Sequence, residues 1–122
     1  MKYIFVLSIV VSILNIVLSS TMYSSGLCIL NTGVAFGVNI YWEVLISAIL
    51  IIFLVVLGVE RQKNDKYLIF SLCALGLSNL IIRVVYDGVC DYISLLGLFF
   101  NLADIFIVFI SIYIFFLLIK DR

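Results

Sequence analysis

Long apolar runs separated by short polar segments form the main pattern along the chain. Four runs approach or reach the roughly 20 apolar residues that a helix needs to cross a membrane. They lie at about 3–22, 42–59, 67–86 and 98–119. The pattern predicts an all-α integral membrane protein, with residues 1–122 forming a single membrane domain built as a bundle of four transmembrane helices.

The first apolar run has a second interpretation, because Lys2 precedes it and Leu18-Ser19-Ser20 closes it. A basic residue, an apolar run and small residues are typical of a cleaved signal peptide. This run is rather long for such a peptide and lacks a convincing small-x-small cleavage site. We therefore favour a transmembrane helix that stays in the protein, with the signal peptide as the alternative.

Composition supports the membrane class and excludes several others. Hydrophobic residues make up 66% of the chain and charged residues 11%, against about half and a quarter in soluble domains. The net charge is zero, which gives no basic surface for nucleic acid. Histidine is absent and the three cysteines are widely spaced, so we expect no metal site and no cofactor.

Basic residues predict the orientation. They gather before the first run, between the second and third, and after the last: Lys2, Arg61, Lys63, Lys66, Lys120 and Arg122. The connections at 23–41 and 87–97 contain no lysine or arginine. Because cytoplasmic loops carry the excess of these residues, we expect both termini in the cytoplasm and both of these connections on the outer side.

The outer connection at 23–41 is rich in Ser, Gly and Asn, with short β-prone pieces between them. Such a composition favours turns and short strands, and predicts a small outward-facing cradle of strands and loops. Cys28 and Cys90 would both face the outer compartment and could form a disulfide. We expect them to be unpaired thiols.

Polar side chains gather in one otherwise apolar stretch: Asn79, Arg83, Asp87, Asp91, Asn101 and Asp104. Polar groups at membrane depth are costly and rarely persist without a partner or a role. Helical spacing places Asn79 and Arg83 on one face, and Asp104 roughly 9 Å below the outer end of the fourth run. Asp91 would lie just above, within reach of Asp104.

Two carboxylates at one site can share a proton, because like charges a few ångströms apart do not both ionise easily. One carboxylate can then deprotonate a water while the other protonates the substrate carbonyl, which is the chemistry of aspartic peptidases. The same residues also fit an ion-pair network in which Arg83 neutralises Asp91 or Asp104. Spacing alone leaves both interpretations open.

Four segments resemble the motifs of the lipoprotein signal peptidase (signal peptidase II) family, and they occur in the order of that family. They are 31–37 (NTGVAFG), 76–83 (GLSNLIIR), 88–93 (GVCDYI) and 100–104 (FNLAD). The resemblance implies a membrane aspartic endopeptidase of the bacterial cytoplasmic (inner) membrane. Its substrates would be diacylglyceryl-modified prolipoproteins, cut just before the lipobox cysteine.

The resemblance also implies roles for single residues. Asp91 and Asp104 match the catalytic pair, and the connection at 23–41 matches a β-cradle. The substrate-binding positions would be Asn31, Asn79, Arg83 and Asn101. The implied partners are the prolipoprotein and membrane lipid. We expect a monomer.

Three positions depart from the family pattern. Ile82 stands where the family usually has an aspartate before the arginine, and Asn15 and Ser19 are the nearest counterparts of a charged first-span motif. We expect the variant Ile82→Asp to fold and to keep activity within tenfold. The alternative function is a non-catalytic four-span membrane protein, a transporter or an accessory subunit, or an inactive relative of the family.

Overall fold

Helices dominate the computed structural model, which describes residues 1–31, 40–61, 65–86, 88–96 and 98–120. The helices are α1 (Lys2–Ser24), α2 (Ile40–Glu60), α3 (Asp65–Tyr86) and α4 (Leu102–Lys120). By length and composition, α1, α3 and α4 can each cross a membrane. In α2 the structure describes side chains only from Val44 onward. Its described apolar part, Val44–Glu60, is therefore shorter than the other three helices.

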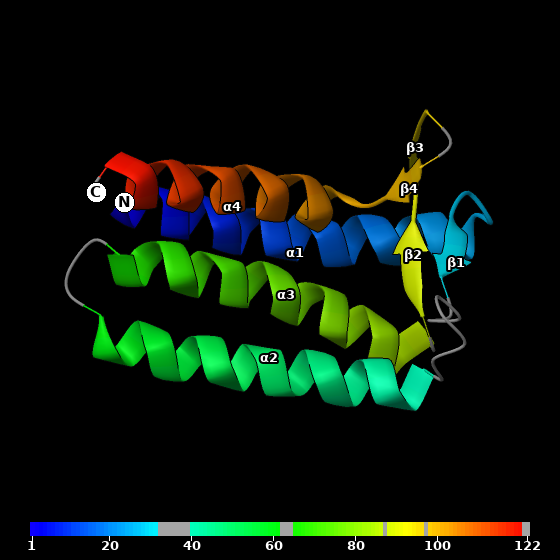
Figure 1. Cartoon of the computed structure of the whole chain (residues 1–122). Coiled ribbons are helices and arrows are strands. Elements are labelled where there is room, and N and C mark those ends of the chain that lie inside the picture. Colours follow the sequence, from blue (N-terminus) through cyan, green and yellow to red (C-terminus); the bar gives the residue numbers. More distant parts are fainter. Residues whose placement is uncertain (32–39, 62–64, 87, 97, 121–122) are drawn as a thin grey trace.

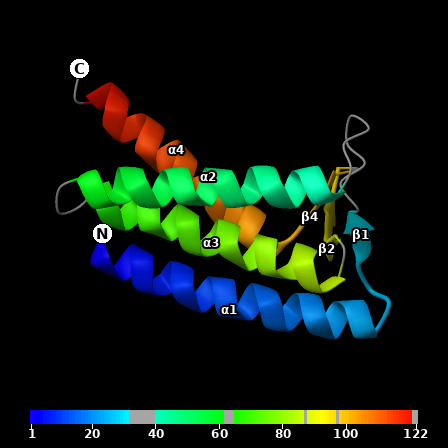
Figure 2. The same cartoon turned by 90° about the horizontal axis from the view of Figure 1, so that it is seen from below.

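The four helices lie side by side, with α3 in the middle and in contact with each of the other three (Figure 1). The N-terminus and the last residues of α4 lie at one end of the bundle, and all the described strands lie at the other (Figures 1 and 2). Arg61, Lys66 and Lys120 stand at helix ends on the side of the N-terminus. We call this the basic end and the opposite one the strand end.

A small apolar core joins three helices: Val11 of α1, Leu68 and Leu75 of α3, and Ala103 and Ile110 of α4. Close approach of α2 to α3 depends on Gly58, because a Cβ there would lie 2.8 Å from the Phe70 ring. The outward faces of α1, α2 and α4 expose many large apolar side chains. Such surfaces suit contact with lipid rather than with water.

Four short strands form two antiparallel pairs at the strand end. The first pair is β1 (Ile29–Asn31) with β2 (Val89–Asp91), and the second is β3 (Ile93–Leu95) with β4 (Leu98–Phe100). In the first pair, Ile29 stands opposite Asp91. Leu96, directly after β3, has φ 54°, a left-handed conformation that favours a turn.

The predicted start of the fourth helical run at 98 was wrong. Residues Leu98–Phe100 form β4, and α4 begins only at Leu102. The apolar run is continuous across both elements, so hydrophobicity alone does not mark the boundary. Asp104 consequently lies in the first turn of α4 rather than well below its end.

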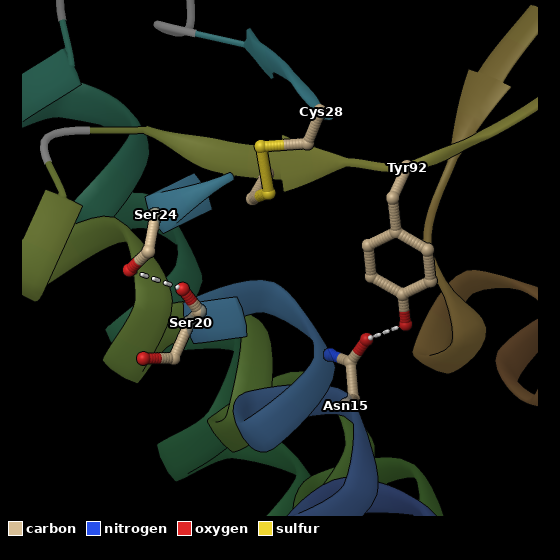
Figure 3. Close-up of a disulfide and its surroundings, with 6 residues drawn as sticks. Asn15, Ser20, Ser24, Cys28 and Tyr92 are labelled. Atoms are coloured by element: carbon tan, nitrogen blue, oxygen red, sulfur yellow. Dashed lines mark hydrogen bonds between the residues drawn. A yellow bond between two sulfur atoms is a disulfide. The ribbon is translucent and has the colours of Figure 1, made fainter. Parts of the chain in front are cut away.

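The expectation of unpaired thiols at Cys28 and Cys90 was also wrong, because the two form a disulfide (Figure 3). The bond joins the chain just before β1 to the middle of β2, across a sequence separation of 62 residues. Cys73 is a free, buried cysteine in α3. Of the predicted outer connection at 23–41, the structure shows the end of α1 and β1, and residues 32–39 lie outside its described part.

Candidate active site

Asn101 and Asp104 form a capping box at the start of α4. The Asn101 side-chain oxygen accepts a hydrogen bond from the Asp104 N–H at 3.1 Å, and Asp104 Oδ2 accepts one from the Asn101 N–H at 3.0 Å. This reciprocal pairing satisfies N–H groups that a helix start otherwise leaves unpaired. The positive end of the helix dipole also favours a carboxylate in this turn. Local sequence thus fixes the Asp104 carboxylate at the strand end of the bundle.

Asn79 of α3 connects to this box through its amide. Its nitrogen donates to Asp104 Oδ1 at 3.3 Å, and its oxygen accepts from the Asn101 side-chain nitrogen at 3.0 Å. Asn101 is fully buried and Asn79 is 7% exposed. The structure therefore brings Asn79, Asn101 and Asp104 together, as the spacing predicts, and commits both amides to contacts within the protein.

Asp91 ends β2 beside this group and is 6% exposed. Burial, and after it the Asp104 carboxylate, raises the pKa of Asp91 while Arg83 lowers it, and together these effects bring the pKa to about 6. The effect of Asp104 on this pKa means that the two carboxylates lie within electrostatic reach of one another. A buried acid whose pKa is raised toward neutral pH is suited to protonate a substrate oxygen.

Arg83 lies in the last turn of α3, one turn beyond Asn79. Its guanidinium donates to the Ser47 hydroxyl of α2 at 2.9 Å and interacts electrostatically with Asp91. It thereby links α2 to the strand end. In the ion-pair interpretation of the sequence, Arg83 neutralises one of the two acids. In the structure, the charge of Arg83 lowers the pKa of Asp91.

Two predicted polar residues lie partly or wholly outside the described part of the structure. The backbone of Asn31 belongs to β1 and pairs with Val89, which places it near the first strand of the group, but its side chain lies outside what the structure describes. Asp87 is not among the described residues. Within the described part of the chain, no three acidic, cysteine or histidine residues gather as a metal site would require.

Two further residues belong to the site, and sequence reasoning did not assign them a role. Asn15 of α1 is fully buried, and its amide nitrogen donates to Asn79 Oδ1 at 3.1 Å and to the Ser78 hydroxyl at 3.2 Å. Tyr92, the residue after Asp91, donates to Asn15 Oδ1 at 2.8 Å (Figure 3). An asparagine inside an apolar run was the available signal, since such a residue needs partners.

The other two departures from the family pattern are also buried. Ser19 lies one turn from Asn15, and its hydroxyl has no hydrogen-bond partner among the described residues. Ile82 is 1% exposed and sits next to Arg83 in the packed interior. This burial changes the expectation for Ile82→Asp, because the new carboxylate would replace a core side chain.

The arrangement combines two interacting acids, one of them held by two N–H donors, at one end of an apolar helix bundle. A family model described as signal peptidase (SPase) II matches residues 2–120, almost the whole chain. Comparisons with curated proteins and with solved structures gave no match. Members of the matched family are membrane-embedded proteases that process lipoproteins. The chain belongs to the signal peptidase II family.

Proposed function

We propose that the protein is an aspartic endopeptidase that removes the signal peptide of diacylglyceryl-modified prolipoproteins, cutting just before the lipobox cysteine. The observation that carries the proposal is the electrostatic pairing of Asp91 with Asp104 inside a chain of this family. Two acids in one site are what direct attack by water on a peptide bond requires, with no covalent intermediate.

The hydrogen bonds support different roles for the two acids. Asp104 accepts N–H bonds at both carboxylate oxygens, an environment that favours a negative charge, so we assign it as the base. Asp91 has the raised pKa and acts as the acid.

Asp104 takes a proton from water, the hydroxide oxygen bonds to the scissile carbonyl carbon, and Asp91 protonates the carbonyl oxygen. Asp104 then passes its proton to the amide nitrogen, the C–N bond breaks, and Asp91 recovers its proton from the diol.

For the four predicted substrate-binding residues we propose two kinds of role. Arg83, which lowers the pKa of Asp91, and Asn31, whose backbone pairs with Val89 of β2, would bind the substrate backbone. Asn79 and Asn101 act mainly by holding Asp104, because their amides already bond within the protein. In this assignment the substrate enters at the strand end, between the cradle and the helices.

We propose that all four helices span the bacterial cytoplasmic membrane, with both termini inside and the site at the outer face. The basic end carries Lys2, Arg61, Lys66 and Lys120, which favours the cytoplasmic side. The disulfide lies at the strand end, and disulfides persist in oxidising compartments. We also propose that the protein works as a monomer.

Depletion of the protein from its cells tests the proposed function. Diacylated prolipoprotein should accumulate uncut, and expression of the wild-type chain should restore processing. A non-catalytic transporter or accessory subunit, or an inactive relative, would leave prolipoprotein processing unchanged. Unchanged processing in fully depleted cells would therefore reject the peptidase assignment.

A further inference from the structure

A ring of hydrogen bonds joins α1, α3 and α4 to Tyr92, which lies between β2 and β3, and ends on Asp104. The Leu102 N–H donates to the Tyr92 hydroxyl at 3.0 Å, and Tyr92 donates to Asn15. Asn15 donates to Asn79, and Asn79 donates to Asp104. Leu102 and Asp104 both belong to the first turn of α4, so the path closes where it began.

Each bond in the ring has a fixed direction. A backbone N–H can only donate, so the Tyr92 oxygen accepts from Leu102 and its own proton goes to Asn15 Oδ1. With its oxygen occupied, Asn15 presents its amide nitrogen to Asn79 Oδ1. Asn79 Oδ1 also receives the Asn101 amide, which leaves the Asn79 nitrogen to face Asp104. Reversing any one amide would place two donors or two acceptors against each other.

We propose that Asn15 and Tyr92 are positioning residues that hold the Asp104 carboxylate in its reactive orientation through Asn79. Neither residue bonds to a carboxylate oxygen among the described contacts, so both act through another residue. The inference rests on the proposed function, because it concerns the orientation of one acid of the pair.

The location of Tyr92 explains how the ring also couples the two acids. Tyr92 follows Asp91 directly, and its hydroxyl reaches down to α1 and to the first turn of α4 (Figure 3). The strand that carries Asp91 is thereby tied to the helix that carries Asp104. Burial raises the pKa of Tyr92, so the hydroxyl keeps its proton and remains a donor across the working pH range.

Tyr92→Phe removes the hydroxyl that contacts Leu102 and Asn15. Asn15→Leu removes the amide that contacts Tyr92, Asn79 and Ser78. Both variants keep a similar side-chain volume. Small displacements of a catalytic group reduce turnover steeply, so we expect each to lower kcat by about 10- to 100-fold while KM changes less than about threefold. The double variant should fall little below the lower single one, because both interrupt the same path. Purified protein and a diacylated prolipoprotein serve as enzyme and substrate, with rates referred to folded protein.

Two control variants lie outside the ring. Tyr113→Phe removes the hydroxyl of a 40% exposed tyrosine on α4, and Ser12→Ala removes a buried hydroxyl that donates only to the Ser8 carbonyl within α1. Both should keep kcat within about twofold of wild type. A merely structural role for the ring would lower the folded fraction and leave kcat per folded molecule unchanged.

Wild-type kcat retained by folded Tyr92→Phe, or strictly multiplicative losses in the double variant, would overturn the positioning role. Failure of wild type and controls to cleave would instead reject the proposed function. Melting temperatures then still test the ring: Tyr92→Phe should cost less in an Asp104→Ala background than in wild type. Equal costs in the two backgrounds would overturn it without reference to activity.

Discussion

At Asp91, burial and the neighbouring Asp104 carboxylate raise the pKa to about 6, while an unfolded chain leaves it near 3.8. The folded state therefore binds this proton more tightly than the unfolded state. The stability that this provides is complete below about pH 4 and is lost as the pH rises through 6. Asp91 consequently destabilises the fold at neutral pH, which fits a side chain retained for function.

The variant Asp91→Asn removes this charge and keeps the size of the side chain. We expect its melting temperature to exceed that of wild type by several degrees at pH 7.5 and to approach the wild-type value near pH 4. Melting in detergent across this pH range measures the difference. A variant less stable than wild type at pH 7.5 would show that the ionised carboxylate is well compensated in the fold.

Ile82→Asp is expected to destabilise the protein strongly. The side chain is 1% exposed, and an ionised acid there must lose its hydration without an arranged partner. We expect a loss of several kcal/mol, whereas Ile82→Val should cost about 1 kcal/mol. Chemical denaturation of both variants provides the comparison. Near-native stability of Ile82→Asp would mean that Arg83 turns to pair with the new acid.

The grouping of Asn79, Asn101 and Asp104 could be predicted from spacing, because Asn101 and Asp104 are three residues apart and a short connection keeps the third and fourth apolar runs adjacent. The role of Asn15 could not, because spacing along one chain does not identify which helix packs beside it. The role of Tyr92 could not be predicted either. Its hydrogen bonds depend on how the end of β2 packs beside the first turn of α4, and no pattern in the sequence specifies that packing.

Element boundaries at the strand end followed local chemistry rather than hydrophobicity. Asn101 with Asp104 three residues later is a helix-start signal, and it would have placed the start of α4 at Leu102. The strands have three residues each, too few for an alternating pattern to stand out from an apolar run. The β1–β2 pairing joins segments 60 residues apart and is a tertiary feature.

The disulfide between Cys28 and Cys90 stabilises this end of the molecule. Closing a loop of 62 residues limits the unfolded chain and contributes about 4 kcal/mol in the chain-entropy account. We expect Cys28→Ser to lower the melting temperature by several degrees. Cys73→Ser, which removes the free cysteine, is the matched control for loss of a thiol. The reductant TCEP should lower the melting temperature of wild type and leave Cys28→Ser unchanged; an equal response from both proteins would contradict the role.

At the scale of the molecule, the arrangement of basic residues and strands predicts which end faces outward. A single cysteine introduced at Ser25 should react with a membrane-impermeant maleimide added outside the cells, and one introduced at Arg61 should not. Both positions are exposed. The native cysteines add little background, because Cys28 and Cys90 are paired and Cys73 is buried. Labelling in the opposite pattern would place the acids on the cytoplasmic side and contradict the proposed function.

Hydrophobic runs predicted a helical membrane protein because each run is long and interrupted by charged or turn-forming residues. The order of the motifs predicted the family, which the match over residues 2–120 confirms. The cysteine pairing was missed because a disulfide depends on the distance between two distant segments. That distance follows from the β1–β2 register, in which Leu30 stands opposite Cys90.

Cleavage of a purified diacylated prolipoprotein by Asp91→Asn and Asp104→Asn tests the paired acids most directly. Each variant keeps the shape of the side chain and removes either the acid or the base. With folding verified by thermal melting, we expect each single variant to lose cleavage and to retain bound, uncut substrate. The double variant should lose little more, because the two residues act as one unit. Substantial turnover by either folded single variant would contradict the mechanism.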